Sequence, residues 1–164
     1  MDVKRAGSAC DARPPPIYRR HIQGCFSPDE ANQLIPRLEI LIRDLQVQAD
    51  VLRKRVNALA RYDDKLGDID LPDVIARYPE LQPIAARMSE IASEIEEMGC
   101  FLKDVDQGLV DFPFLIDAVE AGEEDQVVFL CWQYGEPRVV AWHAIDSGFS
   151  DRHPLPGAPK PMLN

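Results

Sequence analysis

A repeating apolar pattern between Phe26 and Arg61 constrains the fold of this chain more than any other feature of its sequence. One set of apolar side chains recurs every seven residues, and a second set follows three places after each member of the first. The first set is Ile35, Ile42, Ala49 and Val56, and the second is Leu38, Leu45, Leu52 and Leu59. An a/d pattern held for four heptads is typical of a helix that packs along a coiled-coil seam. We therefore predict one long helix over residues 26–61.

The start of this helix is also marked in the sequence. Ser27 suits the N-cap position, Pro28 suits the first helical position, and Glu30 stands three residues after Ser27, which completes a capping box. Pro36 lies beyond the first turn, where its ring removes a backbone hydrogen bond. Because the heptad register continues through Pro36, we expect a bend there and no break.

A second seam follows over residues 79–98. Its apolar positions alternate steps of three and four, and they are Leu81, Ile84, Met88, Ile91, Ile95 and Met98. Gly99 fits the position that stops a helix. Between the seams, residues 62–79 carry Asp, Gly and Pro signals of a loop, with one short helical turn over residues 73–78. Two seams joined by a loop predict a long antiparallel helical hairpin, packed like a coiled coil.

After Gly99 the apolar pattern becomes that of extended strands. We predict strands over residues 101–105, 109–114, 127–132 and 138–144, with Pro113 confining the second of them to an edge or a bulge. The acidic segment 120–125 is predicted to be a loop. The fold class is therefore α+β, a long helical hairpin followed by a small antiparallel β-sheet in the region 100–145. We expect one domain over residues 26–155, a disordered leader over 1–25 and a flexible tail over 156–164.

The last two predicted strands form a hairpin whose register follows from its turn, residues 134–137. With Gln133 opposite Arg138, the paired residues are Val128 with His143, Leu130 with Ala141, and Trp132 with Val139. The other face then carries Val127, Phe129, Cys131, Val140 and Trp142. Because both faces are apolar, both must be covered. The helices can cover one face, and the tail, residues 110–118, a ligand or a second subunit can cover the other.

Charge and cysteine content exclude several classes of protein. The 164 residues carry a net charge of -10, which argues against non-specific binding of nucleic acid, since phosphate binding needs a basic face. No apolar run is long enough to span a bilayer, and the N-terminus lacks the apolar core of a secretory signal. The four cysteines have no paired or zinc-like spacing. We therefore expect free thiols in a cytoplasmic protein that contacts no membrane.

Several short motifs in the C-terminal half occur in a specific order. They are Gly108-Leu109-Val110-Asp111-Phe112-Pro113, Leu130-Cys131-Trp132, Gly135-Glu136-Pro137, Trp142-His143, Gly148-Phe149 and Arg152, and Phe26-Ser27-Pro28-Asp29-Glu30-Ala31 opens the long helix before them. This arrangement resembles the uncharacterised prokaryotic family catalogued as domain of unknown function 2203, over about residues 26–155. The resemblance implies a bacterial cytoplasmic protein and brings no established activity, ligand or catalytic residue.

Three groups of residues in the C-terminal half have the chemistry of a site. His143 with Asp111 and Asp146 could ligate a divalent metal, although no HExxH or H-x-H spacing supports this. Cys131 and His143 are a potential nucleophile pair, but the inferred register places them on opposite faces. A small-molecule pocket would have Trp132 and Trp142 as its walls. Its polar contacts would be Asp111, His143 and Arg152. The full set of candidate ligand-binding residues is Asp111, Trp132, Trp142, His143, Asp146 and Arg152.

Each candidate residue also has a purely structural interpretation. Aromatic residues on strands are commonly core or interface anchors, His143 can donate to a backbone carbonyl or to Asp146, and Arg152 can bridge a carboxylate. The surplus of apolar surface therefore favours a non-enzymatic interaction or assembly protein, a homodimer or an adaptor. The alternative hypothesis is a metal- or small-molecule-binding protein, which could be an enzyme, with its site near Asp111 and His143.

Overall fold

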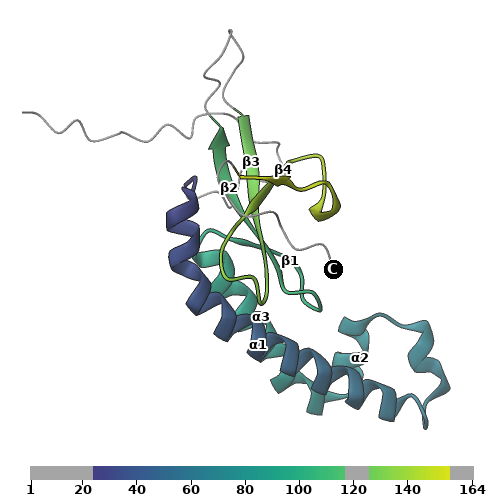
Figure 1. Ribbon diagram of the computed structural model, residues 1–164. Helices are drawn as coiled ribbons and strands as arrows, with labels where there is room; N and C mark the ends of the chain where they lie inside the picture. Colours follow the sequence, from purple (N-terminus) through teal and green to yellow (C-terminus); the bar gives the residue numbers. More distant parts are fainter. Residues whose placement is uncertain (1–23, 117–125, 156–164) are drawn as a thin grey trace, which may run out of the picture.

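The computed structural model describes residues 24–116 and 126–155. Within these ranges the chain folds as helices followed by a five-stranded antiparallel sheet in the order β1-β2-β3-β4-β5 (Figure 1). The elements are α1 (Pro28–Leu59), α2 (Leu71–Arg77), α3 (Gln82–Glu97), β1 (Phe101–Asp104), β2 (Leu109–Ile116), β3 (Gln126–Gln133), β4 (Ala141–Ala144) and β5 (His153–Pro154), with short 3-10 turns at Asp64–Asp68, Pro79–Leu81 and Phe149–Asp151. The predicted α+β class is confirmed. The predictions for residues 1–23, the loop 120–125 and the tail 156–164 lie outside the described residues.

The start of α1 is built as the sequence predicts. Ser27 is the N-cap, and its side-chain oxygen accepts a hydrogen bond from the backbone N–H of Glu30 at 3.2 Å. The Glu30 carboxylate accepts from the backbone N–H of Ser27 at 2.8 Å, which closes the capping box. The helix continues through Pro36 without a break.

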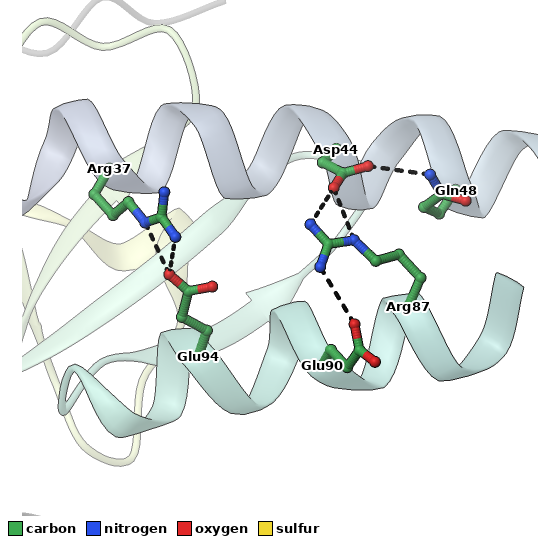
Figure 2. A network of polar contacts seen from close by, with 6 residues as sticks. All are labelled: Arg37, Asp44, Gln48, Arg87, Glu90 and Glu94. Carbon is green, nitrogen blue, oxygen red and sulfur yellow. Dashed lines mark hydrogen bonds and ion pairs between the residues drawn. The ribbon is translucent and has the colours of Figure 1, made fainter. Parts of the chain in front are cut away.

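Helices α1 and α3 run antiparallel against each other over part of α1. Arg37 pairs with Glu94 toward one end of the contact, and Asp44 lies 2.7 Å from an Nη atom of Arg87 toward the other end (Figure 2). Such exposed pairs add little stability, but their order along the two helices shows the antiparallel alignment. The long coiled-coil hairpin is not confirmed, because α1 has 32 residues and α3 only 16. The remainder of α1 packs instead against the segment that joins the helices.

That joining segment, expected to be mostly a loop, is folded. The 3-10 turn at Asp64–Asp68 and α2 cover the far end of α1 (Figure 1). Together these elements enclose a small core of their own. Its buried members are Leu52, Leu66, Val74 and Leu81. Two aspartates of this segment cap these short elements: the carboxylate of Asp63 accepts from the backbone N–H of Lys65, and that of Asp70 accepts from the N–H of Asp73.

The main core lies between the two long helices and one face of the sheet. Its buried residues are Ala31, Ile35, Leu38, Leu41, Ile42, Leu45, Ile91, Ile95, Cys100, Val110, Phe112, Leu130, Trp132 and Val139. Five of the eight predicted seam positions of α1 are buried, so the heptad pattern does mark the face that packs inward. Gly99 ends α3 with a φ of +86°, a left-handed conformation that glycine adopts without strain.

The predicted hairpin register is wrong by one residue. In the structure Phe129 pairs with His143, Leu130 with Trp142, and Cys131 with Ala141. The reason lies in the connection, which is longer than a four-residue turn and runs from the end of β3 at Gln133 to the start of β4 at Ala141. Within this connection, the N–H of Val139 donates to the side-chain oxygen of Asn32 on α1 at 2.8 Å. Val139 is therefore not hydrogen-bonded to β3 through this N–H. A one-residue shift moves every side chain of β4 to the other face.

Pro113 lies at an edge, as predicted. It pairs with Phe129 of β3, while the pairing of β1 with β2 ends at Asp111. The Pro113 carbonyl accepts the backbone N–H of Phe26 at 2.7 Å on the side away from β3. Since the N and O atoms of one strand residue point the same way, the missing amide hydrogen of proline falls on this edge and costs no ladder bond.

Two further sequence predictions have definite outcomes. Cys100 and Cys131 are buried free thiols, but Cys25 is disulfide-bonded, so the expectation of a free thiol is wrong there. Cys10 lies outside the described residues. Among the helices of the described ranges, none combines the length and the apolar character that crossing a bilayer requires.

Candidate functional site

The sheet face opposite the long helices carries a buried pair of charged residues, Asp111 and His143. Asp111 lies on β2 directly opposite Cys131, and His143 lies on β4 opposite Phe129, so the two side chains meet across β3. Nε2 of His143 is 3.3 Å from Oδ2 of Asp111, and each side chain is only 4% exposed. The contact is longer and less well aligned than a regular hydrogen bond, and by strict geometry this carboxylate oxygen has no hydrogen-bond donor.

The surroundings of His143 favour its charged form. The Asp111 carboxylate beside the ring raises the pKa of His143, and the Ala144 carbonyl, 2.8 Å from Nδ1, acts in the same direction. Burial and the nearby Lys103 ammonium act against this shift. Because both ring nitrogens face oxygen acceptors, only the imidazolium, with two N–H groups, can donate to both. Lys103 also approaches Asp111, with Nζ 3.9 Å from Oδ2.

A second set of polar side chains, Arg152 and Glu136, links the C-terminal segment to the β3–β4 connection. Arg152 donates to the Glu136 carboxylate at 3.0 Å, and its guanidinium lies over the Phe149 ring, 3.6 Å from the ring centre. The other carboxylate oxygen of Glu136 accepts the backbone N–H of Gln133 at 2.9 Å. The structural interpretation of Arg152, that it bridges a carboxylate, therefore describes its contacts.

The structure brings together only part of the predicted site. Trp132 and Trp142 lie on the helix-covered face: Trp132 is fully buried in the main core, and Trp142 packs against that core. Asp111 and His143 lie on the other face, so the tryptophans do not form walls around them. Asp146 is exposed after β4, and the part of the chain that the structure describes shows no contact between it and the pair.

The same geometry bears on the metal and nucleophile hypotheses. Across the described ranges, no group of three or more His, Cys, Asp or Glu side chains is arranged to hold a metal ion. Cys131 and His143 lie on the same face of the sheet, and the prediction that placed them on opposite faces is wrong because it used the shifted register. Burial nevertheless raises the pKa of the Cys131 thiol to about 12, which leaves almost no thiolate near neutral pH.

A feature that the sequence reasoning missed is a groove along the outer face of α1. It has a volume of about 570 Å³ and is lined by Glu39, Ile40, Arg43, Asp44, Val47, Tyr134 and Gly135. Ile40 is 61% exposed and Val47 is 53% exposed, so two large apolar side chains face solvent in the same groove. Their spacing of seven residues, on the side of the helix away from the a/d seam, is the signal that could have identified this second stripe.

Comparison with known proteins gives a family and no activity. A search of curated proteins and a search of solved structures found no match. A family described as "Uncharacterized conserved protein (DUF2203)" matches residues 24–155, which include both the outer groove of α1 and the buried Asp111–His143 pair. The chain therefore belongs to this family, as the ordered motifs of its C-terminal half suggested.

Proposed function

We propose that this chain is a non-enzymatic interaction protein, which binds a protein partner through the outer groove of α1. The observation that carries this proposal is the exposure of Ile40 and Val47 within one groove. Apolar side chains rimmed by charged ones are typical of protein-binding surfaces. Here the rim is supplied by Glu39, Arg43 and Asp44.

Two properties of the groove suit it to this role. Its floor is an α-helix held by packing on both sides, so the exposed side chains are presented from a rigid element. One wall is the β3–β4 connection, whose Tyr134 N–H donates to the Gly108 carbonyl at 3.0 Å. A partner therefore meets a preformed surface, and little free energy is lost in ordering it. Location in the bacterial cytoplasm, and the absence of nucleic-acid partners, remain predictions from the sequence.

In-cell photo-cross-linking tests the proposal. A photo-reactive phenylalanine analogue at Ile40 is expected to give a discrete cross-linked species, whereas the same probe at Asn57, also exposed on α1, is expected to give none. Val47→Glu should abolish the Ile40 product, because it places a charge in the apolar contact. If the two probes give the same pattern, or if Val47→Glu leaves the Ile40 product unchanged, the proposal is wrong.

The buried Asp111–His143 pair favours a second candidate function, the binding of a metal ion or small molecule. Its support is the Asp111 oxygen that lacks a regular donor in a site that is 4% exposed. Such an oxygen can accept a ligand donor or ligate a cation. Protein purified without chelator should then contain a stoichiometric divalent metal, or gain thermal stability with one ligand of a metal and metabolite panel. Asp111→Asn should remove either effect. Metal-free protein with an unchanged melting temperature would reject this candidate.

A further inference from the structure

We infer that the partner in the α1 groove is a second copy of the chain, whose α1 lies antiparallel across the first and crosses it near residue 41. This inference rests on the proposed function, since it requires that the groove binds protein. It names the occupant and the register of contact, which follow from how charge is distributed on the two flanks of the Ile40–Val47 stripe.

The two flanks of the stripe carry different charged residues. Arg37 and Asp44 lie on the flank that faces α3, where they pair with Glu94 and Arg87 (Figure 2). Glu39 and Arg43 are one helical turn apart and lie on the other flank, where the groove is bounded by Tyr134 and Gly135. The helix thus presents an apolar stripe with one flank already paired to α3 and one flank whose charges form no ion pair with the residues that the structure describes.

Glu39 and Arg43 are the charges available to a partner. Among the described residues, the ion pairs of α1 use Arg37, Asp44, Asp50 and Arg53, and neither Glu39 nor Arg43 forms one. Both are exposed. Exposed charges beside exposed isoleucine and valine can pair with a complementary surface that covers the apolar side chains.

Two-fold symmetry makes this flank complementary to itself. When two antiparallel helices are related by a two-fold axis, the same flank of each faces the other, and residues at equal distances on either side of the crossing point meet. A crossing midway between Glu39 and Arg43 therefore sets Glu39 of each copy against Arg43 of the other. The dimer therefore contains two Glu39–Arg43 ion pairs between the copies.

The same crossing also aligns the apolar residues. Ile40 lies one residue before the crossing point, so the two copies of Ile40 lie only about 3 Å apart along the helix axis. Val47 lies six residues beyond the crossing point and Pro36 lies five residues before it, so Val47 comes within one residue of the level of Pro36 in the second copy, and Pro36 is exposed. At this register the Ile40–Val47 stripe packs against apolar side chains of the second copy. The flank with Glu39 and Arg43 brings no two like charges together. Because the contact is short, the dimer is expected to be a weak or transient one.

Charge reversal with mixing tests this register. Glu39→Lys alone sets the new lysine against Arg43 in both contacts, and Arg43→Glu alone sets the new glutamate against Glu39 in both. Each variant is therefore expected to weaken self-association at least about tenfold. An equimolar mixture of the two variants should restore association as a heterodimer, because both contacts then join opposite charges. Sedimentation equilibrium over a wide concentration range measures both effects. Glu96→Lys, which makes the same charge change on an exposed position of α3, is the matched control and should associate like the wild type.

The outcomes separate this inference from the proposed function. Each variant should keep a melting temperature close to that of the wild type, since neither Glu39 nor Arg43 has an ion-pair partner inside the described part of the chain and the like-charge pair that each change creates on α1 is exposed and costs little. A wild-type protein that stays monomeric at every concentration, or a mixture that fails to associate, overturns the self-partner. If the Ile40 cross-link then contains a different protein, the groove still binds protein and only its occupant is wrong. If no specific cross-link forms at all, the proposed function fails as well.

Discussion

Replacing His143 with leucine is expected to lower the free energy of unfolding by about 3–5 kcal/mol, which is the usual cost of removing one member of a buried ion pair. Leucine fills a similar volume, so the main loss is the positive charge beside Asp111. The carboxylate would remain buried, at 3% residue exposure, with the Lys103 ammonium 3.9 Å from Oδ2 as the nearby charge. Urea unfolding measures the loss.

Two further variants show whether the charge itself is responsible. His153→Leu removes an exposed histidine that packs on Trp142 and should cost far less. The double variant Asp111→Leu with His143→Leu should recover part of the stability lost in His143→Leu, since it leaves no charge unpaired in the site. If the double variant is less stable by the sum of the two single losses, the two residues do not interact and the ion pair is not the cause.

The same pair predicts a pH dependence with a definite sign. Because Asp111 raises the pKa of His143, the folded state binds this proton more tightly than the unfolded state does. The stabilisation is therefore complete below the unfolded pKa of about 6.5 and is lost as pH rises through the folded pKa. The difference in unfolding free energy between wild type and His143→Leu should shrink between about pH 6.5 and the folded pKa. A difference that grows over this range would contradict the assigned charge state.

The helical part of this fold could be predicted because its signals are local. The capping box at Ser27 and Glu30 and the stop at Gly99 depend on residues within one helical turn, and the structure contains all of them. The heptad pattern identified the buried side of α1, but it could not say what packs there. The sheet packs against one part of the buried side of α1, and the segment containing α2 packs against another part. The heptad seam therefore does not imply one long partner helix.

The candidate site was harder to predict because it depends on contacts that are distant in the sequence. The side-chain oxygen of Asn32 on α1 accepts a hydrogen bond from the N–H of Val139. The β3–β4 connection is therefore longer than the sequence suggests, and β4 is shifted by one residue from the predicted register. That shift places His143 on the face of Asp111 and Cys131 and moves Trp142 to the helix face. Asp111 and His143 were grouped in one candidate site from the sequence, but the side of the sheet on which they lie and the residues around them could be found only from the register.

Replacing Gly108 with alanine is expected to lower the free energy of unfolding by about 2–5 kcal/mol, the sum of a left-handed backbone cost and an overpacking cost. Gly108 has a φ of +64°, and a Cβ atom there would lie 2.5 Å from the Cβ of Tyr134 and 2.9 Å from a methyl group of Ile42. Both distances are far below van der Waals contact, so either α1 or the end of β3 has to move.

A matched glycine separates the two costs. Gly135 has a φ of +93°, and no atom lies within 4 Å of the Cβ position there, so Gly135→Ala carries only the backbone cost of about 1–2 kcal/mol. Urea unfolding of both variants should show Gly108→Ala to be clearly the less stable. Equal losses would mean that the close approach of Gly108 to α1 and β3 is not a constraint on the fold.

Gly108 also connects stability to the groove on α1. Ile42 lies next to the groove residues on α1, and Tyr134 is one of the residues that line the opposite wall. Any movement that accommodates a new Cβ changes the spacing between that helix and that wall. A folded fraction of Gly108→Ala should therefore lose the Ile40 cross-link, whereas Gly67→Ala, which adds a methyl group at an open position outside the groove, should keep it. The absence of a side chain at residue 108 thus lets the sheet approach α1 closely enough to form the surface through which we propose the protein acts.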